Sequence, residues 1–140
     1  APKKEQPADD AQDEADAIRS KALRGAIKAN LEDAVRRVVR RIGNAAEKAA
    51  SKPATFCDWL ESVPDDHGKI VGEMLTPAIT VAAQMTNKGI GPGTIIADLC
   101  AALLDFSGRV TPKTMAAELP KEMARLETEL PAKVSAVFFG

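Results

Sequence analysis

The sequence predicts an all-α fold, a multi-helix bundle of about five or six helices, on the basis of three observations. Ala supplies much of the 45% of hydrophobic residues, and aromatic residues make up only 4%. Small apolar side chains favour closely packed helices over the core of a sheet. Apolar residues recur at steps of three and four residues, and no alternating strand pattern with hairpin turns occurs. At 140 residues, the chain can enclose one core.

The N-terminal part of the chain divides into a tail and one long helix. Residues 1–12 are polar, contain proline and have nothing to bury, so we expect a disordered tail. From about residue 13 to residue 50 the sequence predicts a helix, extended on its apolar side by Ile18 and Ile27 and bent at Gly25 and Gly43. Its seam has the spacing of a coiled coil and consists of Leu31, Val35, Val38, Ile42, Ala45 and Ala49.

Residues 53–140 are predicted to form the helical bundle of the same domain, residues 13–140. Pro53 opens a short helix that Pro64 ends, and the expected packing nucleus is its apolar face of Phe56, Trp59, Leu60 and Val63. A helix over about 67–86 is expected to kink at Pro77, before a break at 87–93. A further helix spans about 94–106. A short helix then ends near Leu119, and the last one begins at Pro120 and bends at Pro131.

Charge is unevenly distributed although the formal net charge is only −1. Residues 1–16 are mainly acidic and residues 19–41 mainly basic. A basic stripe lies away from the seam and consists of Arg36, Arg37, Arg40 and Arg41, with Arg24 and Lys28 on a similar side. Such a stripe could follow a DNA phosphate backbone, although no interleaved aromatic residues are present to stack on bases. The alternatives are a solvated face, or inter-subunit ion pairs with Glu32, Asp33 or the acidic tail.

Few residues suggest catalysis or metal binding. His67 is the only histidine, and its acidic neighbours are explained as a helix start. Cys57 and Cys100 lack the spacing of metal ligands and are expected to be reduced, buried thiols. The Gly-rich loop 89–94 lacks a Walker motif and is interpreted as a hinge. Four carboxylates are interpreted as surface residues, namely Glu118, Glu122, Glu127 and Glu129.

We therefore predict that the chain is not an enzyme, and we predict no cofactor, metal or small-molecule substrate. No apolar run approaches the roughly 20 residues that a membrane span requires, so no membrane partner is expected.

Residues 31–77 read LEDAVRRVVRRIGNAAEKAASKPATFCDWLESVPDDHGKIVGEMLTP. This stretch resembles the C-terminal portion of the HK97-type portal proteins of tailed bacteriophages. In that family a helix of pattern L-E-D-x-x-x-R-x-x-R is followed by Ala/Lys-rich residues, an F-x-x-W-L helix, and a His before an apolar helix that ends near L-x-P. The corresponding residues are Leu31, Glu32, Asp33, Arg37, Arg40, Lys48, Phe56, Trp59, Leu60, His67, Val71, Leu75 and Pro77. The chain departs from the family at 43–45, where Glu-Ala-Leu is common, and at 65–66, where an aromatic residue precedes the His.

The resemblance implies a helical, crown-side part of a portal, or a free-standing relative, since the stem and clip regions of the family are absent. Portals are rings through which DNA passes, so the resemblance implies a homo-oligomer or another phage structural protein as partner. It also implies a location in the host cytoplasm or the virion. The basic stripe would then contact DNA, without reading bases, or a neighbouring subunit.

The predicted function is that of a structural module of a phage head or portal complex, which mediates subunit association. Its predicted packing or oligomer face consists of Leu31, Val35, Val38, Ile42, Phe56, Trp59 and Leu60. Two alternatives stay open. One is a small helical adaptor or regulatory protein that binds a partner in an apolar groove lined by Phe56, Trp59 and Met74. The other is a protein that binds nucleic acid without sequence specificity.

Overall fold

The computed structural model describes residues 6–88 and 91–140, with side chains from residue 10 onward, and it confirms the predicted all-α class. Within these ranges the chain forms five α-helices and one short 3-10 helix, and no strand. The elements in order are α1 (Gln6–Ala49), η2 (Pro53–Thr55), α2 (Phe56–Asp66), α3 (Gly68–Thr86), α4 (Pro92–Arg109) and α5 (Met115–Phe139). None of the described helices is both long and apolar enough to cross a membrane.

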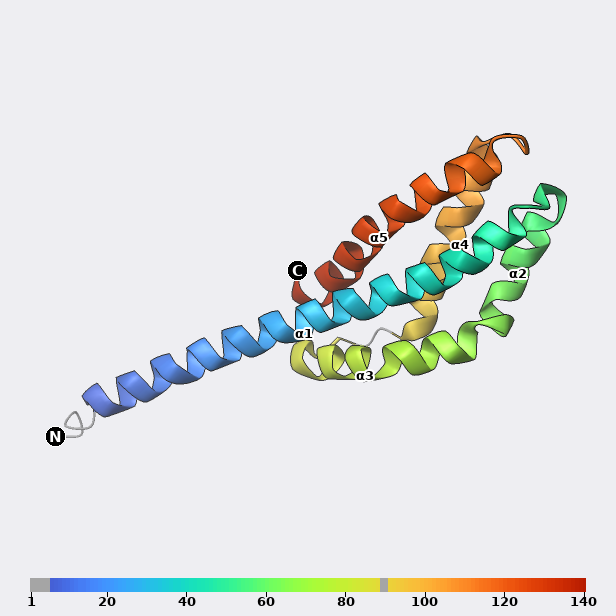
Figure 1. Ribbon diagram of the computed structural model, residues 1–140. Helices are drawn as coiled ribbons and strands as arrows, with labels where there is room; N and C mark the ends of the chain where they lie inside the picture. The colour runs from blue at the N-terminus through green and yellow to red at the C-terminus, as the bar shows by residue number, and fades with distance from the viewer. Residues whose placement is uncertain (1–5, 89–90) are drawn as a thin grey trace.

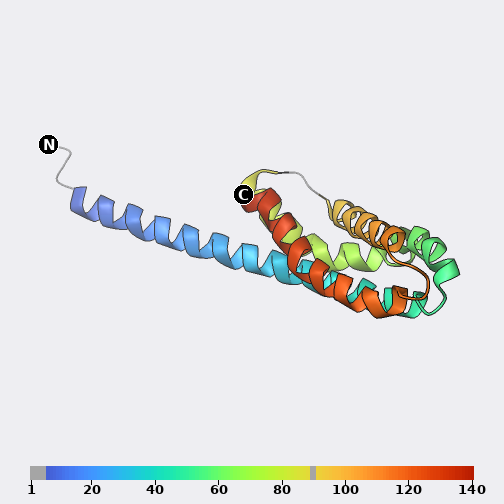
Figure 2. The ribbon, with the colours of Figure 1, turned by 90° about the horizontal axis from the view of Figure 1, so that it is seen from above.

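Helix α1 organises the molecule. Its 44 residues correspond to a length of about 66 Å. The C-terminal half of α1 packs between α5 and α3, which both run antiparallel to it, and α4 lies behind them against α2, α3 and α5 (Figure 1). The N-terminal half extends alone beyond the bundle, as the two perpendicular views show (Figures 1 and 2).

The core forms around the predicted seam of α1. Leu31, Val35, Val38 and Ile42 are all completely buried, together with apolar residues of each of the other α-helices. Burial of one such side chain contributes about 1.5–3 kcal/mol. The seam therefore holds α1 to the bundle, as the coiled-coil spacing predicted.

Two predicted bends of α1 do not interrupt it, since α1 is one helix from Gln6 to Ala49. Gly43 instead marks a close approach of α1 and α5: a Cβ atom at Gly43 would lie 2.7 Å from Cε of Met123. A Cβ atom at Gly25 would meet nothing within 4 Å. A side chain at residue 43 would therefore displace the flexible end of Met123, whereas a side chain at residue 25 would displace nothing.

The predicted long N-terminal helix is confirmed, and it starts earlier than expected. Helix α1 begins at Gln6, seven residues before the predicted start, so its first two turns take up part of the predicted tail. Residues 1–5 lie outside the described residues. An Ala-containing, strongly charged segment can continue a helix that is already formed, because propagation costs much less free energy than nucleation.

Proline also ends fewer helices than predicted. Pro64 lies inside the last turn of α2, which continues to Asp66. The short helix and the last helix that we expected on either side of Pro120 form one continuous helix, α5, with Pro120 and Pro131 inside it. Each internal proline removes one backbone hydrogen bond, and the packing of α5 against α1 outweighs that loss. Of the predicted break at 87–93, Asn87 has the left-handed conformation of a helix end (φ 55°), while residues 89–90 lie outside the described residues.

Candidate interaction surface

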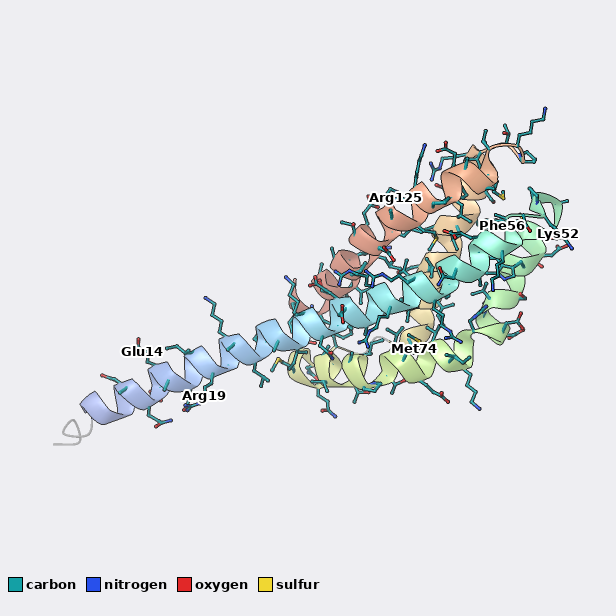
Figure 3. All side chains as sticks on the ribbon, viewed as in Figure 1. Glu14, Arg19, Lys52, Phe56, Met74 and Arg125 are labelled. Carbon is teal, nitrogen blue, oxygen red and sulfur yellow. The ribbon has the colours of Figure 1, made fainter. Side chains whose placement is uncertain are left out.

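The N-terminal half of α1 is the part of the structure without neighbours. We call residues 10–26 the free segment. All of its side chains except Ala15 are exposed, including Ile18 and Leu23, which are 62% and 54% exposed. Glu14 and Arg19 extend from it with no other helix beside them (Figure 3). The free segment is therefore a helix whose surface is available along about 25 Å.

The bundle reaches α1 only near the end of the free segment. The guanidinium carbon of Arg24 lies 5.6 Å from the centre of the Phe139 ring, at the C-terminal end of α5. Ile27 is partly buried and packs against the core, as predicted. From Leu31 to Ile42 the seam is completely buried, whereas its last two residues, Ala45 and Ala49, are only partly buried.

The free segment carries an apolar stripe of its own, Ala11, Ala15, Ile18 and Ala22. Each of these residues precedes one residue of the buried seam by twenty positions, and twenty residues rotate a helix by about 200°. The stripe and the seam consequently face directions about 160° apart. The prediction that Ile18 extends the seam is wrong for this reason, and within residues 6–88 and 91–140 no part of the bundle covers the stripe.

Charge on the free segment separates along its length. Residues 10–16 contain four acidic residues and no basic one, namely Asp10, Asp13, Glu14 and Asp16. Residues 19–28 contain four basic residues and no acidic one, namely Arg19, Lys21, Arg24 and Lys28. One ion pair joins the two groups within the helix, between Asp16 and Arg19. The remaining charges face solvent.

The arginines of the predicted stripe are partly neutralised. Asp33 pairs with Arg36 at 3.3 Å and with Arg37 at 3.8 Å. Arg40 donates a hydrogen bond from Nε to Oε1 of Glu127 on α5, at 2.9 Å. Arg41 is exposed and has no ion pair in the described part of the chain. These are surface ion pairs within one chain, and each is worth at most about 1 kcal/mol. The inter-subunit ion pairs of the alternative stay a prediction.

The acidic residues proposed as partners of the arginines form different contacts. Asp33 pairs with two arginines of its own helix. The carboxylate of Glu32 instead accepts a hydrogen bond of 2.8 Å from the hydroxyl of Ser135 on α5. The acidic residues of the free segment lie too far along α1 to reach Arg36 or the arginines after it in their own chain, because residues 16 and 36 are about 30 Å apart on one helix.

Arg24 and Lys28 do not continue the arginine stripe. They precede Leu31 and Val35 of the seam by seven residues, which places them within about 20° of the seam direction. Arg40 lies sixteen residues after Arg24, on nearly the opposite side of α1. The prediction of one basic stripe from Arg24 to Arg41 is therefore wrong, and the structure brings together only Arg36, Arg37, Arg40 and Arg41.

The predicted packing face is largely core. Phe56 is completely buried and Leu60 is 5% exposed, while Trp59 is half-buried with its ring centre 5.6 Å from that of Phe56. Met74 is partly buried against the core. Because Phe56 is inaccessible, it cannot line the groove that the adaptor alternative required. Figure 3 shows Phe56 where α1 and α2 meet.

The residues considered for catalysis or metal binding are dispersed. Among the described residues, no three or more His, Cys, Asp or Glu side chains are grouped so that they could hold a metal ion. Cys57 is exposed, so the prediction of a buried thiol is wrong for it. Cys100 is half-buried, and burial raises the pKa of its thiol. Both cysteines line a hollow of about 220 Å³ between α2 and α4.

Glu122 is the polar residue for which the surface prediction is wrong. It is only 7% exposed. Its carboxylate forms ion pairs with Arg125 on α5 and, at 3.4 Å, with Arg109 on α4. The signal is present in the sequence, because Glu122 lies three residues after Leu119 and four before Leu126 on the apolar face of α5. Its position makes it a link between two helices.

The chain matches none of the family models, curated proteins or solved structures with which it was compared. The relation of residues 31–77 to portal proteins stays a prediction from the sequence pattern.

Proposed function

We propose that this chain is an assembly module, in which the bundle is a rigid body and the free segment of α1 attaches it to another protein subunit. The observation that carries the proposal is the exposure of the free segment with its apolar stripe. An isolated helix of this length is only marginally stable in water. A partner that covers Ile18 would stabilise the helix and remove apolar surface from water.

The role is mechanical and not chemical. A helix about 25 Å long that projects from a rigid bundle sets the distance and orientation between two bodies. The phage head or portal is the particular assembly that the resemblance of residues 31–77 suggests, and in that setting the module would position subunits in a ring. A ring seen by electron microscopy of the purified chain would support that setting.

The test of attachment is the solution mass of the full chain. We expect the wild-type chain at micromolar concentration to sediment above its monomer mass of 14.8 kDa, whether the partner is a copy of itself or a co-purified subunit. Ile18→Glu should remove that association, since it places a charge in the apolar stripe.

The matched control is Ser20→Glu, which adds the same charge two residues away on the opposite face of the helix. It should associate like the wild-type chain. A wild-type chain that stays at 14.8 kDa up to high concentration, and captures no other subunit, would contradict the proposal.

A second candidate function is contact with a nucleic-acid backbone, favoured by the outward position of Arg37 and Arg41, which lie one turn apart. Duplex DNA binding should then weaken steeply with salt, and Arg37→Gln with Arg41→Gln should abolish it. The control is Arg24→Gln, because Arg24 lies on another side of α1 over Phe139. Absence of binding at low salt would eliminate this candidate.

A further inference from the structure

We propose that the partner of the free segment is a second copy of this chain, and that two α1 helices pair antiparallel with Ala11 of each opposite Ala22 of the other. This inference rests on the proposed function and names the partner. It follows from the spacing of the apolar stripe, from the separation of charge along the helix, and from the direction in which the stripe faces.

The spacing of the stripe suits an antiparallel copy. Ala11, Ala15, Ile18 and Ala22 are separated by four, three and four residues, which is the same pattern read in either direction. An antiparallel partner therefore presents Ala22 to Ala11 and Ile18 to Ala15, on heptad-like spacing. Three of the four side chains are methyl groups, so the two helices can approach closely, and Ile18 is the large side chain that this contact covers.

Charge complementarity selects the antiparallel orientation. In this register residues 10–16 of one chain, with four acidic side chains, lie along residues 17–23 of the other, which contain Arg19 and Lys21. Glu14 flanks the seam on the side where the partner presents Lys21, and two-fold symmetry repeats the pair. Glu14 and Arg19 both project freely from α1 (Figure 3). A parallel pair would instead place four acidic residues beside four acidic residues, which costs free energy.

The bundle leaves room for this pairing. The stripe faces about 160° away from the buried seam, so the second helix lies on the side of α1 that is not packed against α5 and α3. In the proposed register residue 6 lies opposite residue 27, so the paired length ends where the core begins. The contact is two-fold and closes on itself, so it produces a dimer.

Cysteine cross-linking tests the orientation. In the background Cys57→Ser/Cys100→Ser, which removes both native thiols, we introduce Ala11→Cys or Ala22→Cys. An equal mixture of the two purified variants should form a mixed disulfide between position 11 of one chain and position 22 of the other under an oxidising glutathione buffer, well above the level that each variant reaches alone. Predominant cross-links of each variant with itself would indicate a parallel pair and would overturn the inference.

Failure of the inference and failure of the proposed function give different results. A chain that is dimeric by sedimentation but yields no mixed disulfide retains an assembly function and loses the antiparallel pairing. A chain that is monomeric and yields no disulfide loses both. A ring or a complex with a different subunit also overturns the inference, because either excludes the closed pair.

Charge exchange provides a second test on the same contact. Glu14→Lys should raise the dissociation constant by about tenfold, because two symmetry-related attractive pairs become repulsive. The double variant Glu14→Lys/Lys21→Glu should restore the wild-type dissociation constant, since the two charges exchange places and residues 14 and 21 still attract each other. Added salt should weaken the wild-type dimer. A double variant as weak as the single one, or a dimer that salt strengthens, would contradict the pairing.

Discussion

The two halves of α1 belong to one helix but differ in the composition, direction and burial of their apolar faces. The half after Leu31 places Leu, Val and Ile on one face and is completely buried there. The free segment places mainly Ala on the opposite face, and its charges separate by sign along the helix. The buried half packs against the bundle of its own chain, whereas in the described residues the bundle reaches the free segment only at Arg24, near its end. The comparison indicates that a helix can carry one apolar face for its own fold and another for a second molecule.

The largest expected difference between the halves is the cost of removing a leucine. Leu31→Ala should reduce the free energy of unfolding by about 2–5 kcal/mol, because Leu31 is completely buried. Leu23→Ala should change it by less than about 0.5 kcal/mol, since Leu23 is 54% exposed. Urea unfolding of both variants at low protein concentration measures the difference. Equal losses would contradict the separation of the two halves.

Ion pairs should show the same contrast on a smaller scale. Glu122→Ala should cost about 1–3 kcal/mol, because it removes a buried carboxylate that links Arg109 and Arg125. Asp16→Ala removes an exposed pair with Arg19 in the free segment and should cost less than about 1 kcal/mol. Thermal unfolding of the two variants checks the order. A larger loss for Asp16→Ala would reverse the assignment of buried and free regions.

Glycine substitution distinguishes open space from packing. Gly25→Ala should stabilise α1 by about 0.5–1 kcal/mol, because nothing lies within 4 Å of the added Cβ. Gly43→Ala gains the same helix propensity but forces Met123 to move from a distance of 2.7 Å, so its net gain should be smaller. Circular dichroism during urea unfolding provides the comparison. A larger gain at residue 43 would show that the contact of α1 with α5 is loose.

The smallest expected effect is a difference in thiol reactivity. Cys57 is exposed, whereas Cys100 is half-buried and its pKa is raised by burial. A raised pKa leaves less thiolate at neutral pH, so alkylation of Cys100 should be slower than that of Cys57. Mass spectrometry after brief treatment with iodoacetamide measures both rates. Faster modification of Cys100 would mean that the hollow between α2 and α4 opens.

The sequence predicts the buried half of α1 well, because the apolar residues from Leu31 to Ile42 recur at the spacing of one packed helix face. The sequence predicts the structure poorly where tertiary contacts oppose the local preference of a residue. Pro120 and Pro131 lie inside α5 because tertiary contacts outweigh their local preference. The position of Glu122 on the apolar face of α5 can be read from the sequence, but its ion pair with Arg109 cannot, because Arg109 lies on another helix.

The candidate surface can be predicted only in part. The basic residues Arg36, Arg37, Arg40 and Arg41 do lie together, since they share one short helical stretch. Arg24 and Lys28 do not join them, because they lie eight or more residues earlier, at spacings that turn the helix to another side. The sequence pattern suggests that Ile18 continues the seam, and its opposite direction emerges only when α1 is followed as one uninterrupted helix.

Amide hydrogen exchange along α1 tests the central claim most directly, with the full chain measured at nanomolar and at high micromolar concentration. Amides of residues 31–49 should be protected at both concentrations, because their protection comes from the core of the same chain. Amides of residues 10–26 should exchange rapidly when dilute and become protected when concentrated, as a second chain covers the free segment. Exchange in residues 10–26 that does not depend on concentration would contradict the claim.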